Sequence, residues 1–144
     1  MSMRIGHGYD VHAFAPGRKC ILGGVEVPSE LGLLGHSDAD VLVHALMDAI
    51  LGALREGDIG KLFPDDDPAY ENINSGVLLS RVTDIVSLKN AVIKSVNIVI
   101  IAQNPKLSPH IEKMRRNIAA YLGCGVCNGR SYITIRPSVM RTAK

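Results

Sequence analysis

The chain has 144 residues, of which 47% are hydrophobic and 21% charged, a composition that fits one compact domain and disfavours a disordered or fibrous protein. Its 16 basic and 14 acidic side chains leave a formal charge of +2, too even a balance for a nucleic-acid coat. The aromatic residues are two Phe and four Tyr, too few for the stacking platforms that bind single strands.

Cellular location is suggested by what the sequence lacks. No apolar run approaches the roughly 18 to 20 residues that cross a bilayer, and charged residues stand where a signal peptide would be apolar. We therefore expect a cytoplasmic protein without a membrane partner. Three cysteines are an odd number, which favours a reducing compartment over a disulfide framework. Cys124 and Cys127 have the spacing of half a zinc knuckle, but the sequence has no second pair to complete it.

The first predicted elements are β-strands. In residues 3–14 the side chains alternate in character after Gly8, which predicts a strand with Asp10 and His12 on the same face. Residues 20–27, CILGGVEV, are rich in β-forming residues around a glycine pair, which predicts a bulge or a hairpin. The start of the chain is therefore expected to be a β-hairpin.

Helices dominate the middle of the chain. Apolar residues recur at helical spacing over 39–55, the clearest helix of the sequence, and a second helix is predicted over 75–89. Residues 56–67 are rich in glycine and aspartate and predict a loop. Residues 91–102 predict a strand apolar enough to be buried on both faces. A third helix is predicted over 108–123, with proline in its first turn.

The end of the chain, residues 124–144, is the least informative segment. It is basic, and Tyr132 to Ile135 predict a short strand. The order of hairpin, two helices, strand, helix and final strand predicts a single domain over 1–144. Its fold class is α/β (α+β), a mixed β-sheet with helices packed on one face.

Asp10, His12 and His44 are the sharpest candidate for chemistry. One carboxylate with two imidazoles is the ligand set of a catalytic zinc ion, which leaves a fourth position open. Asp40 and Asp48 stand one helical turn either side of His44, so they are candidates to orient its second ring nitrogen. The alternative is an exposed hydrogen bond between Asp10 and His12 beside a solvated helix face. Spacing alone leaves both interpretations open.

Two further segments are candidates for binding an anionic ligand. His36 and Ser37 lie where a loop meets a helix, and the free N–H groups and dipole at such a junction favour a phosphate. A simple helix cap at Ser37 is the alternative. The segment 58–65, DIGKLFPD, has a glycine for close approach and an aspartate suited to ribose hydroxyls, but not the spacing of a Walker loop. Lys106 could reach a phosphate, or be a solvated lysine.

Four segments of the sequence resemble one family. They are GHGYDVHAF at 6–14, GLLGHSDADVLVHALMDAILGA at 32–53, GDIGKLFPDDDP at 57–68 and IIAQNPKLSPHIEKMRRNIAAYLG at 100–123. All four are similar to the 2-C-methyl-D-erythritol 2,4-cyclodiphosphate synthases, enzymes of the non-mevalonate isoprenoid pathway. The similarity is collinear from residue 3 to about residue 123, and four motifs in the same order argue against a chance likeness. The resemblance favours the metal interpretation.

The resemblance implies a set of site residues in a homotrimer. It implies Zn²⁺, or another divalent metal, at Asp10, His12 and His44, and a catalytic role for His36 in stabilising the transition state. The substrate-binding residues that it implies are Asp10, His12, His36, Ser37, Asp58, Ile59, Gly60, Phe63, Pro64, Asp65, Asp66, Asp67, Ala102, Gln103, Asn104, Pro105, Lys106, Leu107 and Ser108. Residues 102–108 are expected to reach the pocket of the neighbouring subunit.

The resemblance also implies the reaction, which makes the enzyme a phosphorus–oxygen lyase. The 2-phosphate of 4-diphosphocytidyl-2-C-methyl-D-erythritol 2-phosphate attacks the β-phosphorus, expels CMP and closes the 2,4-cyclodiphosphate ring. Because the substrate supplies its own nucleophile, the protein contributes positioning and charge neutralisation. The family uses Mg²⁺ or Mn²⁺ with this cytidine diphosphate substrate.

Residues 124–144 depart from the family pattern. The family continues there with a Thr-Thr-x-Glu-Lys-Leu-Gly-Phe-Thr-Gly-Arg motif, which cannot be aligned to this chain. The residues of the cytidine pocket and of the second metal that the motif provides therefore have no assigned counterpart. Two functions remain open: an active synthase, and a zinc-binding, catalytically impaired trimeric homologue that binds nucleotide or isoprenoid diphosphate. A zinc phosphohydrolase, which would give a linear product, is a third.

Overall fold

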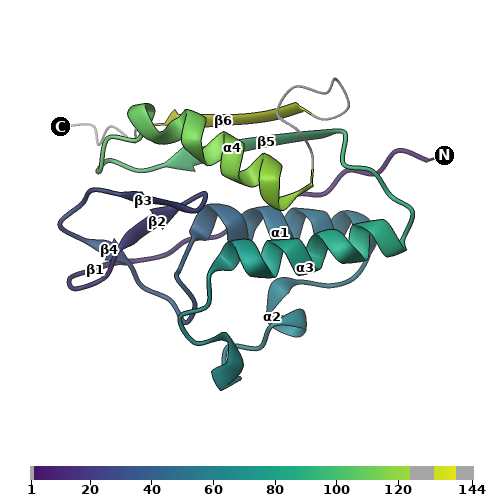
Figure 1. Cartoon of the computed structure of the whole chain (residues 1–144), viewed down its shortest axis with the longest axis horizontal. Coiled ribbons are helices and arrows are strands. Elements are labelled where there is room, and N and C mark those ends of the chain that lie inside the picture. The colour runs from purple at the N-terminus through teal and green to yellow at the C-terminus, as the bar shows by residue number, and fades with distance from the viewer. Residues whose placement is uncertain (1, 124–131, 139–144) are drawn as a thin grey trace.

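The structure is a computed structural model, and it describes residues 2–123 and 132–138. Its helices are α1 (Val41–Leu54), α2 (Ile59–Leu62), α3 (Ser75–Leu88) and α4 (Ile111–Tyr121), with 3₁₀ turns at Pro68–Tyr70 and Ser108–His110. Its strands are β1 (Phe14–Ala15), β2 (Cys20–Leu22), β3 (Val25–Val27), β4 (Gly32–Leu33), β5 (Ser95–Ile101) and β6 (Tyr132–Ser138). Figure 1 shows α1 beside α3, with α4 next to them and against the β5–β6 pair.

The described strands form three pairs. β1 pairs with β4 and β2 with β3, both antiparallel, whereas β5 and β6 are parallel. Helices α1 and α4 contact the β5–β6 pair, and the buried side chains of that pair belong to one face. The predicted α/β class is therefore confirmed, with both strand directions present. The strands stay in separate pairs within the described residues instead of joining into one sheet.

The prediction of a strand over residues 3–14 is wrong except at its last residue. Only Phe14 of that segment belongs to a strand, β1, which pairs with β4, while β2 and β3 pair with each other. The preceding residues lie against α1 instead. A Cβ atom added at Gly8 would lie 1.8 Å from the carbonyl oxygen of Ala45, so this approach of the two backbones requires glycine.

The predicted hairpin over residues 20–27 is confirmed as β2 and β3. Its turn is Gly23–Gly24, and both residues have positive φ, 57° and 69°, which suits a tight two-residue connection. Cys20, Leu22, Val25 and Val27 are buried beneath it. The hairpin thus contributes one end of the core.

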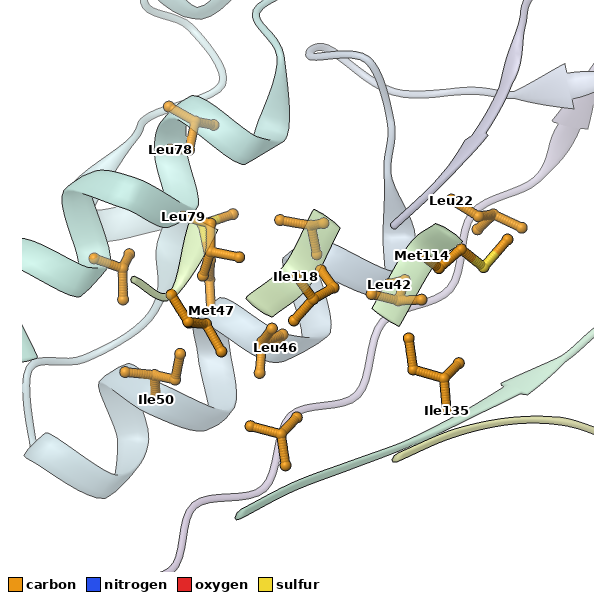
Figure 2. Close-up of a cluster of buried hydrophobic side chains, with 14 of the residues drawn as sticks. Leu22, Leu42, Leu46, Met47, Ile50, Leu78, Leu79, Met114, Ile118 and Ile135 are labelled. Carbon is orange, nitrogen blue, oxygen red and sulfur yellow. The ribbon is translucent and has the colours of Figure 1, made fainter. Parts of the chain in front are cut away.

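All three predicted long helices are present. Their apolar stripes meet in the core shown in Figure 2, where Met47 of α1, Leu79 of α3 and Ile118 of α4 are fully buried. Burying three such side chains stabilises the fold by several kcal/mol, at about 1.5–3 kcal/mol each. The helical periodicity of the sequence therefore reflects real burial.

Two predictions of regular structure need correction. Residues 56–67 are not wholly a loop, because Asp58 accepts a hydrogen bond from Lys61 N at 2.9 Å and caps the short helix α2. The predicted strand over 91–102 begins only at Ser95 and is buried on one face. Val99 and Ile101 are 55% and 58% exposed, since the helices of this chain cover the opposite face only.

Near the end of the chain, the final strand is longer than predicted. The strand predicted at Tyr132 to Ile135 is confirmed and extends to Ser138. Cys124 and Cys127, with most of the basic tail, lie outside the described residues. Among the helices of residues 2–123, none is long and apolar enough to span a membrane.

Candidate metal centre and anion-binding cleft

The three predicted metal ligands meet in one cleft of about 210 Å³. Asp10 and His12 come from the segment before β1, and His44 comes from the first turn of α1. The other residues that line the cleft are Gly35, His36, Ser37, Met47, Ile59, Gly60, Phe63, Asp65, Tyr70 and Leu78. The predicted metal ligands, the predicted anion site and the 58–65 segment thus share one cavity.

The ligand atoms form a compact triangle. Asp10 Oδ2 lies 2.9 Å from His12 Nε2 and 3.3 Å from His44 Nδ1, and the two nitrogens are 3.3 Å apart. A tetrahedral zinc ion holds such ligands at about 2.0–2.2 Å, which separates neighbouring ligand atoms by about 3.3–3.5 Å. Edges of 3.3, 3.3 and 2.9 Å are close to that spacing, so the triangle fits one divalent ion.

Local backbone packing produces this meeting. The Asp10 segment approaches α1 at Gly8, directly beside Ala45, and so reaches the turn that carries His44. Asp10 and His12 then point the same way, as the alternating pattern predicts, although no strand ladder holds them. The close contact of Gly8 with α1, and not pairing in a sheet, therefore positions Asp10 and His12 beside His44.

The outer nitrogen of His12 has a fixed partner. His12 Nδ1 lies 2.7 Å from the carbonyl oxygen of Leu34, and because a carbonyl only accepts hydrogen bonds, Nδ1 carries a proton. Nε2, the inner nitrogen, is therefore the atom of this ring that faces Asp10 and His44. A ligand histidine whose other nitrogen donates to a backbone carbonyl is a recurrent feature of metal sites.

His44 is buried, with 8% of its surface exposed. Burial lowers the pKa of its imidazole, so the ring is held in the neutral form that binds metals, with Asp10 acting in the opposite direction. Its outer nitrogen, Nε2, lies 3.1 Å from Ser37 Oγ and 3.0 Å from Ser75 Oγ. Two serine hydroxyls therefore surround the side of the ring away from the ligand triangle.

The prediction that Asp40 and Asp48 orient His44 is wrong. Asp40 accepts hydrogen bonds from Gly23 N at 2.9 Å and Gly24 N at 2.7 Å, on the hairpin side of α1. Asp48 accepts from Ile59 N at 2.9 Å and holds α2. Ser75 occupies the orienting position instead, and no spacing in the sequence indicates it, because it starts a different helix.

His36 and Ser37 both line the cleft, as the anion-site prediction requires. The backbone N–H groups there are less available than predicted. Ala39 N already donates to Ser37 Oγ, and Asp40 N to Asp38 Oδ1, both at 3.2 Å. Side chains, more than these N–H groups, are therefore positioned to meet an anion.

Arg18 holds the loop that carries the anion-site residues, and sequence analysis missed it. Its Nε donates to Leu33 O at 2.9 Å and its Nη2 to Ser37 O at 3.0 Å. His36 Nε2 lies 3.3 Å from Asp67 O, which joins this loop to the segment after α2. The loop is thus fixed from both sides.

The remaining predicted site residues divide into two groups. Ile59, Gly60, Phe63 and Asp65 line the cleft, together with the unpredicted apolar residues Met47, Tyr70 and Leu78. Asp58, Pro64, Asp66 and Asp67 are close in sequence but do not line it, and none of residues 102–108 does. The phenyl ring of Phe63 meets Tyr70 edge to face at 5.5 Å, which closes one wall.

Comparison with known proteins identifies relatives over most of the chain. The profile of the YgbB family matches residues 3–129. The 2-C-methyl-D-erythritol 2,4-cyclodiphosphate synthase of Agathobacter rectalis is 61% identical over 117 residues, which cover 81% of this chain and 66% of that protein. The enzyme of the same name from Pelobacter propionicus is 60% identical over 120 residues, which cover 83% of this chain and 76% of that protein.

A solved structure shares the fold. A 2C-methyl-D-erythritol-2,4-cyclodiphosphate synthase structure, described as its CDP-bound form, superposes with a TM-score of 0.82 at 36% identity. The superposition covers 94% of this chain and 89% of that one. Most of the chain therefore shares its fold with a protein whose structure is described as bound to CDP.

Proposed function

Since the chain belongs to the YgbB family, we propose that it is a phosphorus–oxygen lyase of isoprenoid biosynthesis. It converts 4-diphosphocytidyl-2-C-methyl-D-erythritol 2-phosphate into 2-C-methyl-D-erythritol 2,4-cyclodiphosphate and CMP. One observation carries the proposal: the ligand triangle of Asp10, His12 and His44 opens into the same cleft as His36 and Ser37. A divalent cation and anion-binding side chains in one cavity are what a diphosphate transfer requires.

The ligand triangle is the place for the resident metal. Zn²⁺ suits its one oxygen and two imidazole nitrogens, and when bound it would neutralise and polarise the diphosphate. Mg²⁺ or Mn²⁺ is proposed to arrive with the substrate. The chain's part is to present the ligand atoms: burial favours the neutral form of His44, and the carbonyl of Leu34 holds Nδ1 of His12 so that Nε2 of that ring faces the triangle.

The protein's own residues position the substrate for attack on itself. Ser37 and His36 would donate hydrogen bonds to oxygens of the diphosphate, His36 to the charge that develops in the transition state. Ile59 and Gly60, which line the cleft, would meet the ribose together with Asp58, which precedes them at the cap of α2. The apolar wall formed by Phe63 and Tyr70 restricts water in the cleft. Because no side chain acts as nucleophile, catalysis here is orientation and charge stabilisation.

A homotrimer is part of the proposal. The outward face of the β5–β6 pair exposes Val99, Ile101 and Tyr132, and the N-terminal segment exposes Ile5. Exposed apolar surface of this kind is typical of an interface between subunits. Residues 102–108 lie away from the chain's own cleft, which is consistent with a role in the cleft of a neighbouring copy.

The test is to incubate the purified protein with the diphosphocytidyl substrate and Mg²⁺. We expect CMP release on the order of 1 s⁻¹ or faster, with the cyclic diphosphate as the phosphorus NMR product. Metal-stripped protein is the matched control and should be inactive until a divalent metal is restored. A linear product would point to a phosphohydrolase, and zinc binding without CMP release to the catalytically impaired homologue.

A further inference from the structure

We propose that Ser75 and Asp38 are positioning residues that determine which nitrogen of His44 faces the metal. By occupying the outer nitrogen of that ring, they also leave the hydroxyl proton of Ser37 available to an anion in the cleft. The inference rests on the proposed metal site at Asp10, His12 and His44. The sequence patterns did not single out Ser75.

The first step concerns the hydroxyl proton of Ser75. The Asp38 carboxylate receives three hydrogen bonds: Oδ1 from Ser75 Oγ, Oδ1 from Asp40 N at 3.2 Å, and Oδ2 from Ser75 N at 3.0 Å. A carboxylate only accepts, so the hydroxyl of Ser75 must donate its proton to Asp38. Ser75 Oγ can therefore offer His44 nothing but a lone pair.

The second step concerns the ring. His44 Nε2 lies 3.0 Å from Ser75 Oγ, and because that oxygen accepts, Nε2 must carry the ring proton. Nδ1 is then unprotonated and points its lone pair at Asp10 and His12. A partner on the outer nitrogen that fixes the tautomer of a ligand histidine is a recurrent feature of metal sites.

The third step concerns Ser37. Its oxygen lies 3.2 Å from Ala39 N, which donates to it, and 3.1 Å from His44 Nε2, whose one proton it shares with Ser75 Oγ and which, being protonated, cannot accept. The proton of the Ser37 hydroxyl is used by neither contact. Since Ser37 lines the cleft, that proton is available to a phosphate oxygen, and Ser75 is at 3.5 Å the more distant alternative.

Burial strengthens the hydrogen bonds that link Asp38, Ser75, His44 and Ser37, which we call the relay. Ser75 is 0% exposed and Ser37 7%, so water does not compete for these hydrogen bonds. The competing explanation is that Ser75 merely starts α3 and fills space. The two explanations differ in what they predict for the metal and for the tautomer of His44, and they are therefore separable.

The experiment is Ser75→Ala, with Ser80→Ala as its matched control. Ser80 lies on the same helix, and within the described part of the chain its hydroxyl donates to Gly76 O of that helix at 3.0 Å and does not contact His44. We expect Ser75→Ala to weaken zinc binding, measured against a competing chelator, by about 10–100-fold, and Ser80→Ala to leave it unchanged. Because no substrate is used, failure here is distinguishable from failure of the proposed lyase activity.

A spectroscopic readout separates positioning from packing. In metal-free protein labelled with ¹⁵N at histidine, we expect the wild type to show His44 protonated at Nε2 only, and Ser75→Ala to show a mixture of tautomers. Ser75→Thr keeps the hydroxyl and should restore the single tautomer. Wild-type zinc affinity with an unchanged His44 tautomer in folded Ser75→Ala would overturn the proposal.

Asp38→Asn is the second variant, in case Ser75→Ala unfolds. Both oxygens of Asp38 accept from backbone N–H groups, so an amide in either orientation would set its NH₂ against a donor. We expect the same loss of zinc affinity and the same mixture of His44 tautomers. Retention of both wild-type properties in this variant would also contradict the relay.

Discussion

Asp38 and Asp40 stand two residues apart at the start of α1, yet they serve opposite sides of the helix. Asp38 bonds to Ser75, which contacts His44 on the cleft side. Asp40 bonds to Gly23 and Gly24 on the hairpin side and also caps the helix through Val43 N at 3.2 Å. The same residue type at nearly the same position thus supports the metal site in one case and the scaffold in the other.

The hairpin side is a closed structural unit. The Gly23–Gly24 turn donates its N–H groups to Asp40, while its carbonyl oxygens accept from Asn117 Nδ2 at 3.2 and 3.1 Å. The cleft side, by contrast, gathers one carboxylate and two imidazoles whose ligand atoms contact one another at the wall of a cavity. The difference teaches that carboxylates bonded to backbone N–H groups mark the scaffold, whereas polar side chains clustered in a cavity mark the site.

The largest effect should come from the cleft side, with His44→Ala. Removing one of three ligands should abolish stoichiometric zinc and reduce CMP release by on the order of 10²–10³-fold or more. The fold should remain, because an open catalytic site contributes less to folding than a closed structural one. Elemental analysis of zinc per chain tests the loss of metal, and a thermal melting curve tests whether the fold remains.

The control for this variant is His110→Ala. His110 lies in the 3₁₀ turn before α4, outside the cleft, so its removal should leave the zinc content unchanged. Full zinc occupancy in His44→Ala would refute the ligand assignment and, with it, the distinction between the two sides of α1.

The next largest effect should come from the hairpin side, with Asp40→Ala. The variant removes the helix cap and the acceptor for the two glycine N–H groups, which we expect to cost about 2–4 kcal/mol in the free energy of unfolding. Zinc affinity of the folded protein should change little. Chemical denaturation and a zinc titration measure the two quantities. Loss of zinc at unchanged stability would reverse the roles we assign to Asp38 and Asp40.

A smaller effect concerns pH. Burial raises the pKa of Asp40 from 3.8 to about 7, although the N–H groups of Gly24 and Gly23 act against the rise. The folded state therefore binds this proton more tightly than the unfolded state. The contribution of Asp40 to stability is highest below about pH 4, falls as the pH rises to about 7, and is constant above that.

Asp40→Asn has no such proton to lose and tests this directly. Between pH 5 and 6, metal-free wild type should lose up to about 1.4 kcal/mol of unfolding free energy relative to the variant. Urea denaturation at each pH measures the difference. Parallel pH profiles for the two proteins would show that Asp40 does not titrate in this range.

Much of the fold could be predicted from the sequence because it depends on local periodicity. The apolar stripes of α1, α3 and α4 are visible as helical spacing, and the Gly23–Gly24 turn is visible as a glycine pair. Strand pairing could not be predicted in the same way. Residues 9–13 have the alternation of a strand, but the segment lies against α1, where Gly8 meets the carbonyl of Ala45, and no strand of the described residues pairs with it.

The candidate site shows the same limit. Asp10 and His12 are visible from their spacing, and His44 from its place on a helix with two aspartates. Asp40, His44 and Asp48 follow one another at intervals of four residues, which suggested that these aspartates orient the imidazole. Asp40 and Asp48 instead bond to the hairpin and to α2, which pack beside α1. Ser75 lies 31 residues from His44, and only the packing of α3 against α1 brings it there.

The smallest effect should come from an exposed carboxylate on the same hairpin. Glu26 bonds to Lys19 Nζ at 2.9 Å, but the two side chains are 58% and 68% exposed. Water and salt screen such a pair, so we expect Glu26→Gln to change the free energy of unfolding by less than about 0.5 kcal/mol. Measured beside Asp40→Ala, it compares a buried with an exposed carboxylate on one hairpin. A Glu26→Gln loss as large as the Asp40→Ala loss would mean that the hairpin depends on its surface charge, and that Asp40 is not its principal attachment to α1.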